Sequence, residues 1–467
     1  MDVAGYDSRV MTRRQPARFG AVALALLLLG SIVPTASATT IVHATEVAAP
    51  AASAIVPGTV NRTSIALRAT YQTTLNVSYA TRSFRVDSTA TITNESGGRI
   101  DRVELNTIAA KLGGMRLTTV TVDGTRVTPR ISGQTILVPL GGVLPDGATA
   151  TVRVAYRATL RTSLSGSSWL FTKVNGILGA YRWLPWVSRA RPFDRPNHGD
   201  PFYTPVSPLV RLTVNADRRL VVATSGEQTG SSPGGWTTYH EARNVRDMTF
   251  TAAPDYRTRS TTVGDTTIRY YYRSSTNAAR ILDAAADAFR AIQSRLGDYP
   301  YRTFKVVQSP GGYGMESPAL IWIPYGVSSA NIRYLVAHET AHQWFYGLVG
   351  NDQSRQPFAD EAAADFMGRF VTSTRRSSRC ATGRLDLDIY HYSAACYYER
   401  IYIQGGNLID EARRRMGSTA FWRALKGYVA ANRYGLVTNE TLLDALDAGT
   451  SLNLGAGLFD TRFPSIY

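Results

Sequence analysis

The segment HETAHQWF, at residues 338–345, constrains this 467-residue chain more than any other feature. Its two histidines, His338 and His342, are four positions apart, so on a helix they share one face and can converge on one metal ion. Glu361 follows nineteen positions later in FADEAAADF and adds a carboxylate from a separate segment. Two histidines and one carboxylate leave a fourth position open, as in catalytic zinc sites. The pattern therefore predicts one Zn²⁺ ion held by these three side chains.

Glu339 lies beside the first histidine, on the flank of the metal-binding face. From there its carboxylate reaches the open position of the metal rather than the metal itself. Zinc lowers the pKa of its water to about 7, and a nearby carboxylate can accept the proton as that water attacks a carbonyl. Glu339 is therefore the candidate general base for hydrolysis of an amide bond. The alternative is a chance motif on an amphipathic helix, in which Leu335, Val336 and Phe345 are simply core.

Asp365 lies four residues beyond Glu361, on the same face of an expected helix. From that position it is a candidate to orient a ligand histidine through the ring nitrogen that does not bind the metal. A solvated surface aspartate is the alternative.

Three segments carry a resemblance to a known family. HETAHQWF with its distant glutamate is similar to the gluzincin metallopeptidases, and in particular to the aminopeptidase-N-like family. GGYGMESP, at residues 311–318, resembles that family's GAMEN element. The resemblance implies that Glu316 binds the free amino terminus of a substrate, and that Gly314 and Met315 lie along the strand that pairs with the substrate backbone. IYIQGGNLID, at residues 401–410, resembles the family's tyrosine-containing stretch, which implies that Tyr402 stabilises the oxyanion.

The same stretch holds competitors for that tyrosine role, which could equally be core or pocket lining: Tyr390, Tyr392, Tyr397 and Tyr398.

The chain also departs from the family pattern. Asp360 stands where the family usually has asparagine, and Gln404 where it often has lysine, and neither change is expected to alter the essential chemistry. The second amine-binding residue that family aminopeptidases usually supply is not identifiable. The resemblance therefore implies an aminopeptidase acting on peptides or proteins. A zinc endopeptidase or processing protease with an open cleft is the alternative, and a non-catalytic surface binding module on a peptidase fold is a third hypothesis.

The order of sequence patterns predicts an α+β fold of two domains. Short alternating runs such as TVRVAYRATL, broken by turns at Asp123-Gly124, indicate an antiparallel β-sandwich or saddle over residues 61–257. Helical spacing follows, as at Ile281, Leu282 and Phe289. The resemblance implies that residues 258–467 form a thermolysin-like mixed α/β catalytic domain with a mostly helical C-terminal lobe. This would be a short form without the helical domain that family members commonly carry beyond it.

The amino terminus has the pattern of an export signal. Arg13 and Arg14 precede an apolar run from Phe19 to Val33, and an AxA arrangement ends at Ala38. We expect a signal peptide over residues 1–38, a flexible leader over 39–60, and a secreted or cell-surface protein. The alternative is an uncleaved anchor that ties the chain to a membrane or cell surface through this segment.

The formal net charge of +16 does not indicate a nucleic-acid partner. Only four of the 51 basic residues are lysine, and the arginines are dispersed, which is more typical of coding composition than of a binding surface. The two cysteines, Cys380 and Cys396, lie close together in a chain expected to be exported, so a disulfide is predicted. Two unlinked buried thiols are the alternative. The sequence does not indicate an oligomeric state.

Overall fold

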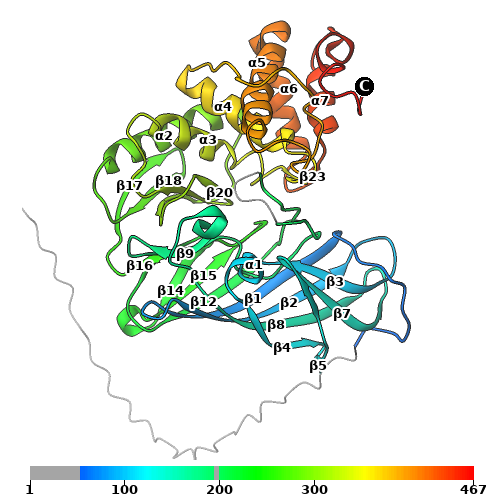
Figure 1. The fold of residues 1–467 in the computed structure, drawn as a ribbon, viewed down its shortest axis with the longest axis vertical. Coiled ribbons are helices and arrows are strands. Elements are labelled where there is room, and N and C mark those ends of the chain that lie inside the picture. Colours follow the sequence, from blue (N-terminus) through cyan, green and yellow to red (C-terminus); the bar gives the residue numbers. More distant parts are fainter. Residues whose placement is uncertain (1–52, 194–198) are drawn as a thin grey trace, which may run out of the picture. The chain divides into compact units, whose positions relative to one another are not determined.

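The computed structural model describes residues 53–193 and 199–467. The predicted signal peptide and most of the predicted leader lie outside the described residues. Strands dominate from β1 (Leu67–Ser78) to β18 (Thr266–Tyr272), and helices dominate from α2 (Ala278–Leu296) onwards (Figure 1). The predicted α+β class is therefore confirmed. Within the described ranges, none of the helices has both the length and the apolar character that crossing a bilayer requires.

The largest sheet has eight strands in the order β14-β15-β12-β1-β2-β8-β4-β5. Every second residue of β1 and β2 is buried, as the alternation in the sequence predicts. The Asp123-Gly124 turn joins β4 to β5 with positive φ at both positions. One pair, β1 with β12, is parallel, which differs from the expectation of antiparallel strands alone. The strands not yet located are β2 (Ser83–Asn94), β4 (Arg116–Val122), β5 (Thr125–Arg126), β8 (Thr149–Thr159), β12 (Val210–Ala216), β14 (Glu227–Ser231) and β15 (Thr237–Ala242).

Two four-stranded sheets and the eight-stranded sheet share one hydrophobic core. The ring of Phe84 lies at its centre and meets Phe171, Trp183 and Phe250 edge to face. The first of these smaller sheets has the order β13-β16-β10-β9, and the second has the order β11-β3-β7-β6. Their strands are β3 (Ile100–Asn106), β6 (Arg130–Ser132), β7 (Thr135–Leu144), β9 (Phe171–Val174), β10 (Ile177–Ala180), β11 (Trp186–Val187), β13 (Val221–Thr224) and β16 (Phe250–Ala253).

A five-stranded sheet underlies the segments that carry the predicted site. Its order is β17-β18-β19-β21-β20, with parallel pairs from β18 to β21 and antiparallel pairs at both ends. The short strand β20 is therefore at an edge of the sheet, and one side of its backbone is not paired with another strand. The strands are β17 (Arg257–Val263), β18, β19 (Thr303–Ser309), β20 (Met315–Ser317) and β21 (Leu320–Pro324).

The helices after α2 pack on one another and on this sheet around a second hydrophobic core. Two π-helical turns, η3 and η4, come directly before α4 and α5 and hold residues of the predicted site. A short ladder of β22 (Gly350–Asn351) and β23 (Leu436–Val437) joins the segment after α3 to the segment before α7. The remaining helices and turns are α1 (Ile108–Leu112), η1 (Gly166–Leu170), η2 (Pro233–Gly235), α3 (Ile332–Ala341), η3 (Phe358–Ala362), α4 (Ala363–Thr372), η4 (Glu399–Gln404), α5 (Gly405–Met416), α6 (Ser418–Ala431), α7 (Asn439–Asp447) and η5 (Gly455–Phe459).

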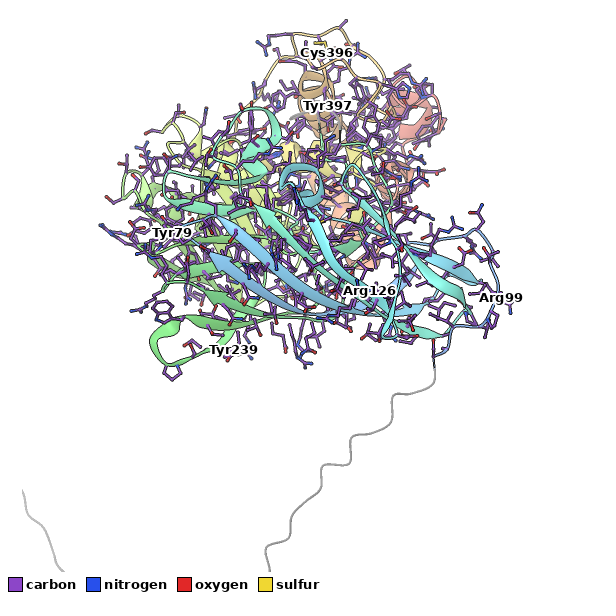
Figure 2. The ribbon with its side chains drawn as sticks, turned by 60° about the horizontal axis from the view of Figure 1, so that its bottom comes forward. Tyr79, Arg99, Arg126, Tyr239, Cys396 and Tyr397 are labelled. Atoms are coloured by element: carbon purple, nitrogen blue, oxygen red, sulfur yellow. A yellow bond between two sulfur atoms is a disulfide. The ribbon has the colours of Figure 1, made fainter. Side chains whose placement is uncertain are left out.

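A disulfide joins Cys380 to Cys396 in the long connection between α4 and η4. Figure 2 shows Cys396 next to Tyr397 at the end of this connection. The bond closes a loop of 16 positions, and it ties the segment that leaves α4 to the turn that leads into η4.

Candidate metal centre

The helix α3 brings the two histidines together at its carboxyl end. His338 lies in the last turn of the helix, and His342 is the residue that caps it. Val336, Ala337 and Ala341 of the same helix are buried in the second core, so the helix is fixed in place by packing. The two imidazole rings meet edge to face with their centroids 4.8 Å apart.

Glu361 reaches the same point from the π-helical turn η3. The Nε2 atoms of His338 and His342 are 3.2 Å apart, and Glu361 Oε2 lies 3.3 and 3.4 Å from them. Tetrahedral zinc with bonds of about 2.0–2.1 Å would hold its ligand atoms about 3.3–3.4 Å apart. The three side chains therefore have the spacing that one zinc ion requires.

The electrostatics of these side chains also fit a cation. Burial would raise the pKa of Glu361, but the two histidines hold it below its usual value. Burial would lower the pKa of His342, but Asp360 and Glu361 raise it well above its usual value. Glu361 Oε2 and Glu339 Oε2 are buried and have no hydrogen-bond partner among the described residues. Several carboxylates thus surround two histidines in a space from which water is largely excluded, and a divalent cation would compensate them.

Asp360 orients one of the two histidines. Its Oδ1 lies 2.8 Å from His342 Nδ1, which also lies 3.1 Å from the carbonyl oxygen of Phe345. A hydrogen bond at Nδ1 fixes the ring and leaves Nε2 free for a metal. The expectation that Asp360 leaves the essential chemistry unchanged is therefore too simple, since this residue supports a candidate ligand directly. Its place one residue before Glu361 was the only sequence signal for this contact.

Asp365, the residue expected to orient a histidine, contacts other groups. Its carboxylate accepts hydrogen bonds from Tyr334 and from Arg369 Nη2, the latter at 3.0 Å. Asp365 is buried, which differs from the alternative of a solvated aspartate. His338 Nδ1 is buried without a hydrogen-bond partner among the described residues. A direct bond from Asp365 to His338 stays a prediction.

Glu339 faces the space in front of the three candidate ligands. It lines the cavity that His338, His342 and Glu361 also line. Burial raises its pKa well above the usual value, and the charges of Glu316 and Glu361 raise it further. Gly314 lies directly against it, because a Cβ atom at this glycine would collide with Glu339 Oε1. The absence of a side chain at position 314 therefore leaves room for the candidate base.

Glu316 lies on the edge strand β20, close to Glu339 and His342. Its Oε1 accepts a hydrogen bond of 3.0 Å from Gln353 Nε2, and the same nitrogen donates to Asp360 Oδ2 at 2.8 Å. Burial raises the pKa of Glu316. Gln353 thus connects the candidate amine anchor to the aspartate that orients His342, and sequence reasoning did not identify it.

Two arginines from the β-rich part of the chain, Arg182 and Arg246, reach this region. Arg182 Nη2 donates to Gln353 Oε1 at 2.9 Å and to the hydroxyl of Tyr346 at 2.6 Å. Arg246 donates to the carbonyl oxygens of Gly347 and Leu348 at 3.3 and 3.2 Å. These contacts hold the segment after His342 in place from the β-rich half of the chain.

Tyr402 lies beside the candidate ligands, as its predicted role requires. Its ring is stacked on His338 with centroids 5.5 Å apart. Burial raises the pKa of its hydroxyl well above the usual value, and the charge of Glu361 adds to this. Among its competitors, Tyr397 and Tyr398 also line the cavity, whereas Tyr390 and Tyr392 do not. Tyr334 lines it as well and was not considered from the sequence.

One cavity of about 470 Å³ is lined by the three candidate ligands and by Glu316, Glu339 and Tyr402. Trp169 and Tyr313 form an aromatic part of its wall, with ring centroids 5.7 Å apart. Asp200, from the β-rich half, also lines it. Burial raises the pKa of Asp200 well above the usual value, and the charge of Glu316 raises it further. The cavity therefore contains a carboxylate that the sequence motifs do not mark.

The fold resembles that of known metallopeptidases. A crystal structure of an M1 zinc metallopeptidase from Deinococcus radiodurans matches with a TM-score of 0.64 and 20% identity, over 88% of this chain and 95% of that one. A mutant of an M1 zinc metallopeptidase from the same organism matches with a TM-score of 0.65 and 19% identity, over 87% and 96% of the two chains. A mutant with a bound Tyr-Ser-Ala substrate matches with a TM-score of 0.64 and 18% identity, over 88% and 96%.

No protein-family model matches this chain. At the identities given above, the likeness shows the fold, and the resemblance inferred from the motifs is confirmed at that level. The roles of individual residues depend on the geometry of this chain alone.

Proposed function

We propose that this chain is a zinc-dependent peptidase that releases amino-terminal residues from peptides. The observation that carries the proposal is the spacing of 3.2–3.4 Å among His338 Nε2, His342 Nε2 and Glu361 Oε2, with Glu339 and Glu316 in the same cavity. The solved mutant that binds Tyr-Ser-Ala has the same fold, which supports a peptide as substrate.

The chemistry divides among the residues as follows. His338, His342 and Glu361 would hold Zn²⁺, which when bound supplies a Lewis acid that activates water and polarises a carbonyl. Glu339 accepts the proton of the attacking water on Oε2 and returns it to the leaving nitrogen. Tyr402 donates a hydrogen bond to the developing oxyanion. The backbone of Gly314 and Met315, at the free edge of the sheet, pairs with the substrate backbone.

Selection of an amino terminus depends on the buried carboxylates. Glu316 and Asp200 both line the cavity, and the charge of Glu316 raises the pKa of Asp200. A substrate ammonium group placed near them would offset this repulsion and form charge-assisted hydrogen bonds. Asp200 thus supplies the second acidic group that the motifs do not identify.

The proposal also covers the division of the chain into two domains and the export of the protein. Residues 258–467 form a thermolysin-like catalytic domain with a helical C-terminal lobe, and residues 61–257 form the β domain. The protein is exported by its amino-terminal segment. The disulfide between Cys380 and Cys396 supports export, because such bonds persist mainly in oxidising compartments.

Zinc analysis and aminoacyl reporter substrates test the proposal. Purified protein should contain one zinc per chain, and it should hydrolyse leucine p-nitroanilide until a chelator removes the metal. Glu339→Gln should keep the zinc and lose activity by on the order of a thousandfold or more. Absence of zinc, or equal activity in this variant, would refute the proposal.

A zinc endopeptidase or processing protease is the second candidate, since the cavity at the centre extends beyond the metal-binding residues. Acetylation of the substrate's amino terminus separates the two. An aminopeptidase loses the acetylated peptide as a substrate, whereas an endopeptidase still cleaves it. A binding module without catalysis would cleave neither.

A further inference from the structure

A second hollow, of about 480 Å³, adjoins the cavity of the metal centre. The two spaces share part of their walls: Tyr313, Gly314, Tyr334, Leu335 and Tyr398. Because five residues line both, the second hollow borders the cavity of the metal centre directly.

The order of residues along α3 shows which end of a substrate the second hollow receives. Glu316 lies near His342, at the carboxyl end of the helix. Gly314 lies against Glu339 and Leu335, which precede His342 along the helix. The second hollow is lined by Asn331, Tyr334 and Leu335, at the amino end, and by none of the three candidate ligands. A peptide whose amine binds at Glu316 would therefore place the residues after the scissile bond in this hollow.

Arg376 provides a cation in the wall of the hollow. Its Nη1 donates a 2.6 Å hydrogen bond to the hydroxyl of Tyr398, and it forms no ion pair among the described residues. The neighbouring arginines differ in this respect, since Arg375 pairs with Asp410 at 3.6 Å and Arg379 pairs with Glu399 at 2.7 Å. The charge of Arg376 is therefore available to a ligand.

The position of Arg376 is fixed relative to the metal centre. Tyr398, its hydrogen-bond partner, meets Tyr402 at a tilt of 38° with ring centroids 4.6 Å apart, and Tyr402 stacks on His338 at 5.5 Å. The disulfide ties Cys380, four residues after Arg376, to Cys396, two residues before Tyr398. A covalent link and a row of packed rings thus place the segment of Arg376 beside the metal centre.

We propose that this hollow is a subsite for the leaving segment of the substrate, and that Arg376 binds a carboxylate on that segment. The proposal rests on the peptidase function proposed above and specifies its substrate class, which is short peptides with a negative group just beyond the cleaved residue. A guanidinium matches a carboxylate with two parallel hydrogen bonds. The carboxylate can be the carboxyl terminus of a tripeptide or an acidic side chain.

Three peptides and two variants test the subsite. The peptides are Leu-Gly-Gly, Leu-Gly-Gly-amide and Leu-Gly-Asp-amide. In the natural protein, kcat/KM should be about tenfold higher for the free acid than for the neutral amide, as one charge-assisted pair at a partly exposed position implies. Arg376→Gln should bring this ratio close to one. Arg375→Gln, which removes an adjacent exposed arginine, should leave the ratio at its natural value.

The ratio of kcat/KM for acid and amide distinguishes recognition of a carboxylate by Arg376 from a structural role of that residue. If Arg376→Gln lowers kcat/KM equally for all three peptides, or if the natural protein prefers neither Leu-Gly-Gly nor Leu-Gly-Asp-amide over Leu-Gly-Gly-amide, the subsite is wrong. A preference for Leu-Gly-Gly alone assigns the terminal carboxylate, and a preference for Leu-Gly-Asp-amide alone assigns the acidic side chain. Either result supports the carboxylate site.

Calorimetry keeps the test independent of turnover. Binding of Leu-Gly-Gly and its amide to the Glu339→Gln protein should show the same tenfold difference, and Arg376→Gln in that background should remove it. If the protein proves not to be a peptidase, this binding difference still decides whether the hollow recognises a carboxylate. Equal affinities of the Glu339→Gln protein for Leu-Gly-Gly, Leu-Gly-Gly-amide and Leu-Gly-Asp-amide would overturn the subsite.

Discussion

Asp360 places a carboxyl group behind His342, where the family that this chain resembles usually has a neutral amide. The carboxylate lies 2.8 Å from His342 Nδ1, and both groups are buried. A charged acceptor makes the imidazole a stronger electron donor than an amide acceptor would, because it stabilises positive charge on the ring. Such buried hydrogen-bond partners of the ligands influence the affinity for zinc. A motif defined by the spacing of the ligands does not identify them.

Replacement of Asp360 tests this contact. Asp360→Ala removes the hydrogen bond, so zinc affinity should fall about ten- to a hundredfold, as for other residues that support metal ligands. Asp360→Asn keeps an acceptor without the charge and should lose less. Competition with a chelator measures both constants. Unchanged zinc affinity in the alanine variant would show that the Phe345 carbonyl is enough to orient the ring.

Gly314 gives a second test at this scale. An alanine there would push its Cβ into the carboxylate of Glu339, so Gly314→Ala should displace the candidate base while the three metal ligands stay in place. We expect kcat to fall on the order of a hundredfold, since small displacements at a reacting group cost about that much. Zinc content should not change.

The control is Gly427→Ala on α6, where a Cβ meets no neighbouring atom within 4 Å. This change should leave kcat as it is and slightly favour the helix. Equal activity of the two alanine variants would show that Glu339 does not need its present position.

At the scale of elements, Gln353 joins segments that are far apart in sequence. It follows β22 and bonds to Glu316 on β20, to Asp360 in η3 and to Arg182 from the β-rich half. The amide satisfies two acceptors and one donor at once. A single buried side chain therefore links β20, η3 and the segment of Arg182, in addition to core packing.

Gln353→Leu should loosen this arrangement. The buried oxygens of Glu316 and Asp360 would lose a donor, at a cost of about 1–3 kcal/mol in the free energy of unfolding. KM for an aminoacyl substrate should rise more than kcat falls, because the role proposed for Glu316 is to bind the amine and not the reacting carbonyl. Steady-state kinetics and urea unfolding measure the two effects. A loss of kcat alone would contradict the positioning role assigned to Gln353.

At the scale of the whole molecule, the sequence predicted what depends on local pattern. The spacing of His338, His342 and Glu361 required a helix and a second segment, and alternation required the long strands β1 and β2. Contacts made across the fold could not be predicted. Arg182 and Arg246 look like two of many dispersed arginines in the sequence, yet burial and carbonyl partners in the second half give them their roles.

The acid sensitivity of the molecule gives a last prediction, from His240 on β15. Burial and, to a smaller extent, the charge of Lys305 lower the pKa of His240 to about 3. An unfolded histidine has a pKa of about 6.5. Between pH 6.5 and 3 the unfolded chain therefore binds a proton that the folded chain does not. The free energy of unfolding falls as pH falls through this range, by up to about 1.4 kcal/mol per pH unit from this group.

Above pH 6.5 the ring is neutral in both states and contributes no pH dependence. His240→Gln should consequently lose less stability between pH 7 and pH 5 than the natural protein, when urea midpoints are compared at constant zinc. His391→Gln is the matched control, because that ring is 70% exposed and should not change the slope. If His240→Gln and His391→Gln lose the same stability between pH 7 and pH 5, burial of His240 does not govern the loss of stability in acid. The β-rich half, far from the reacting groups in sequence, would then not set the lower pH limit of the fold.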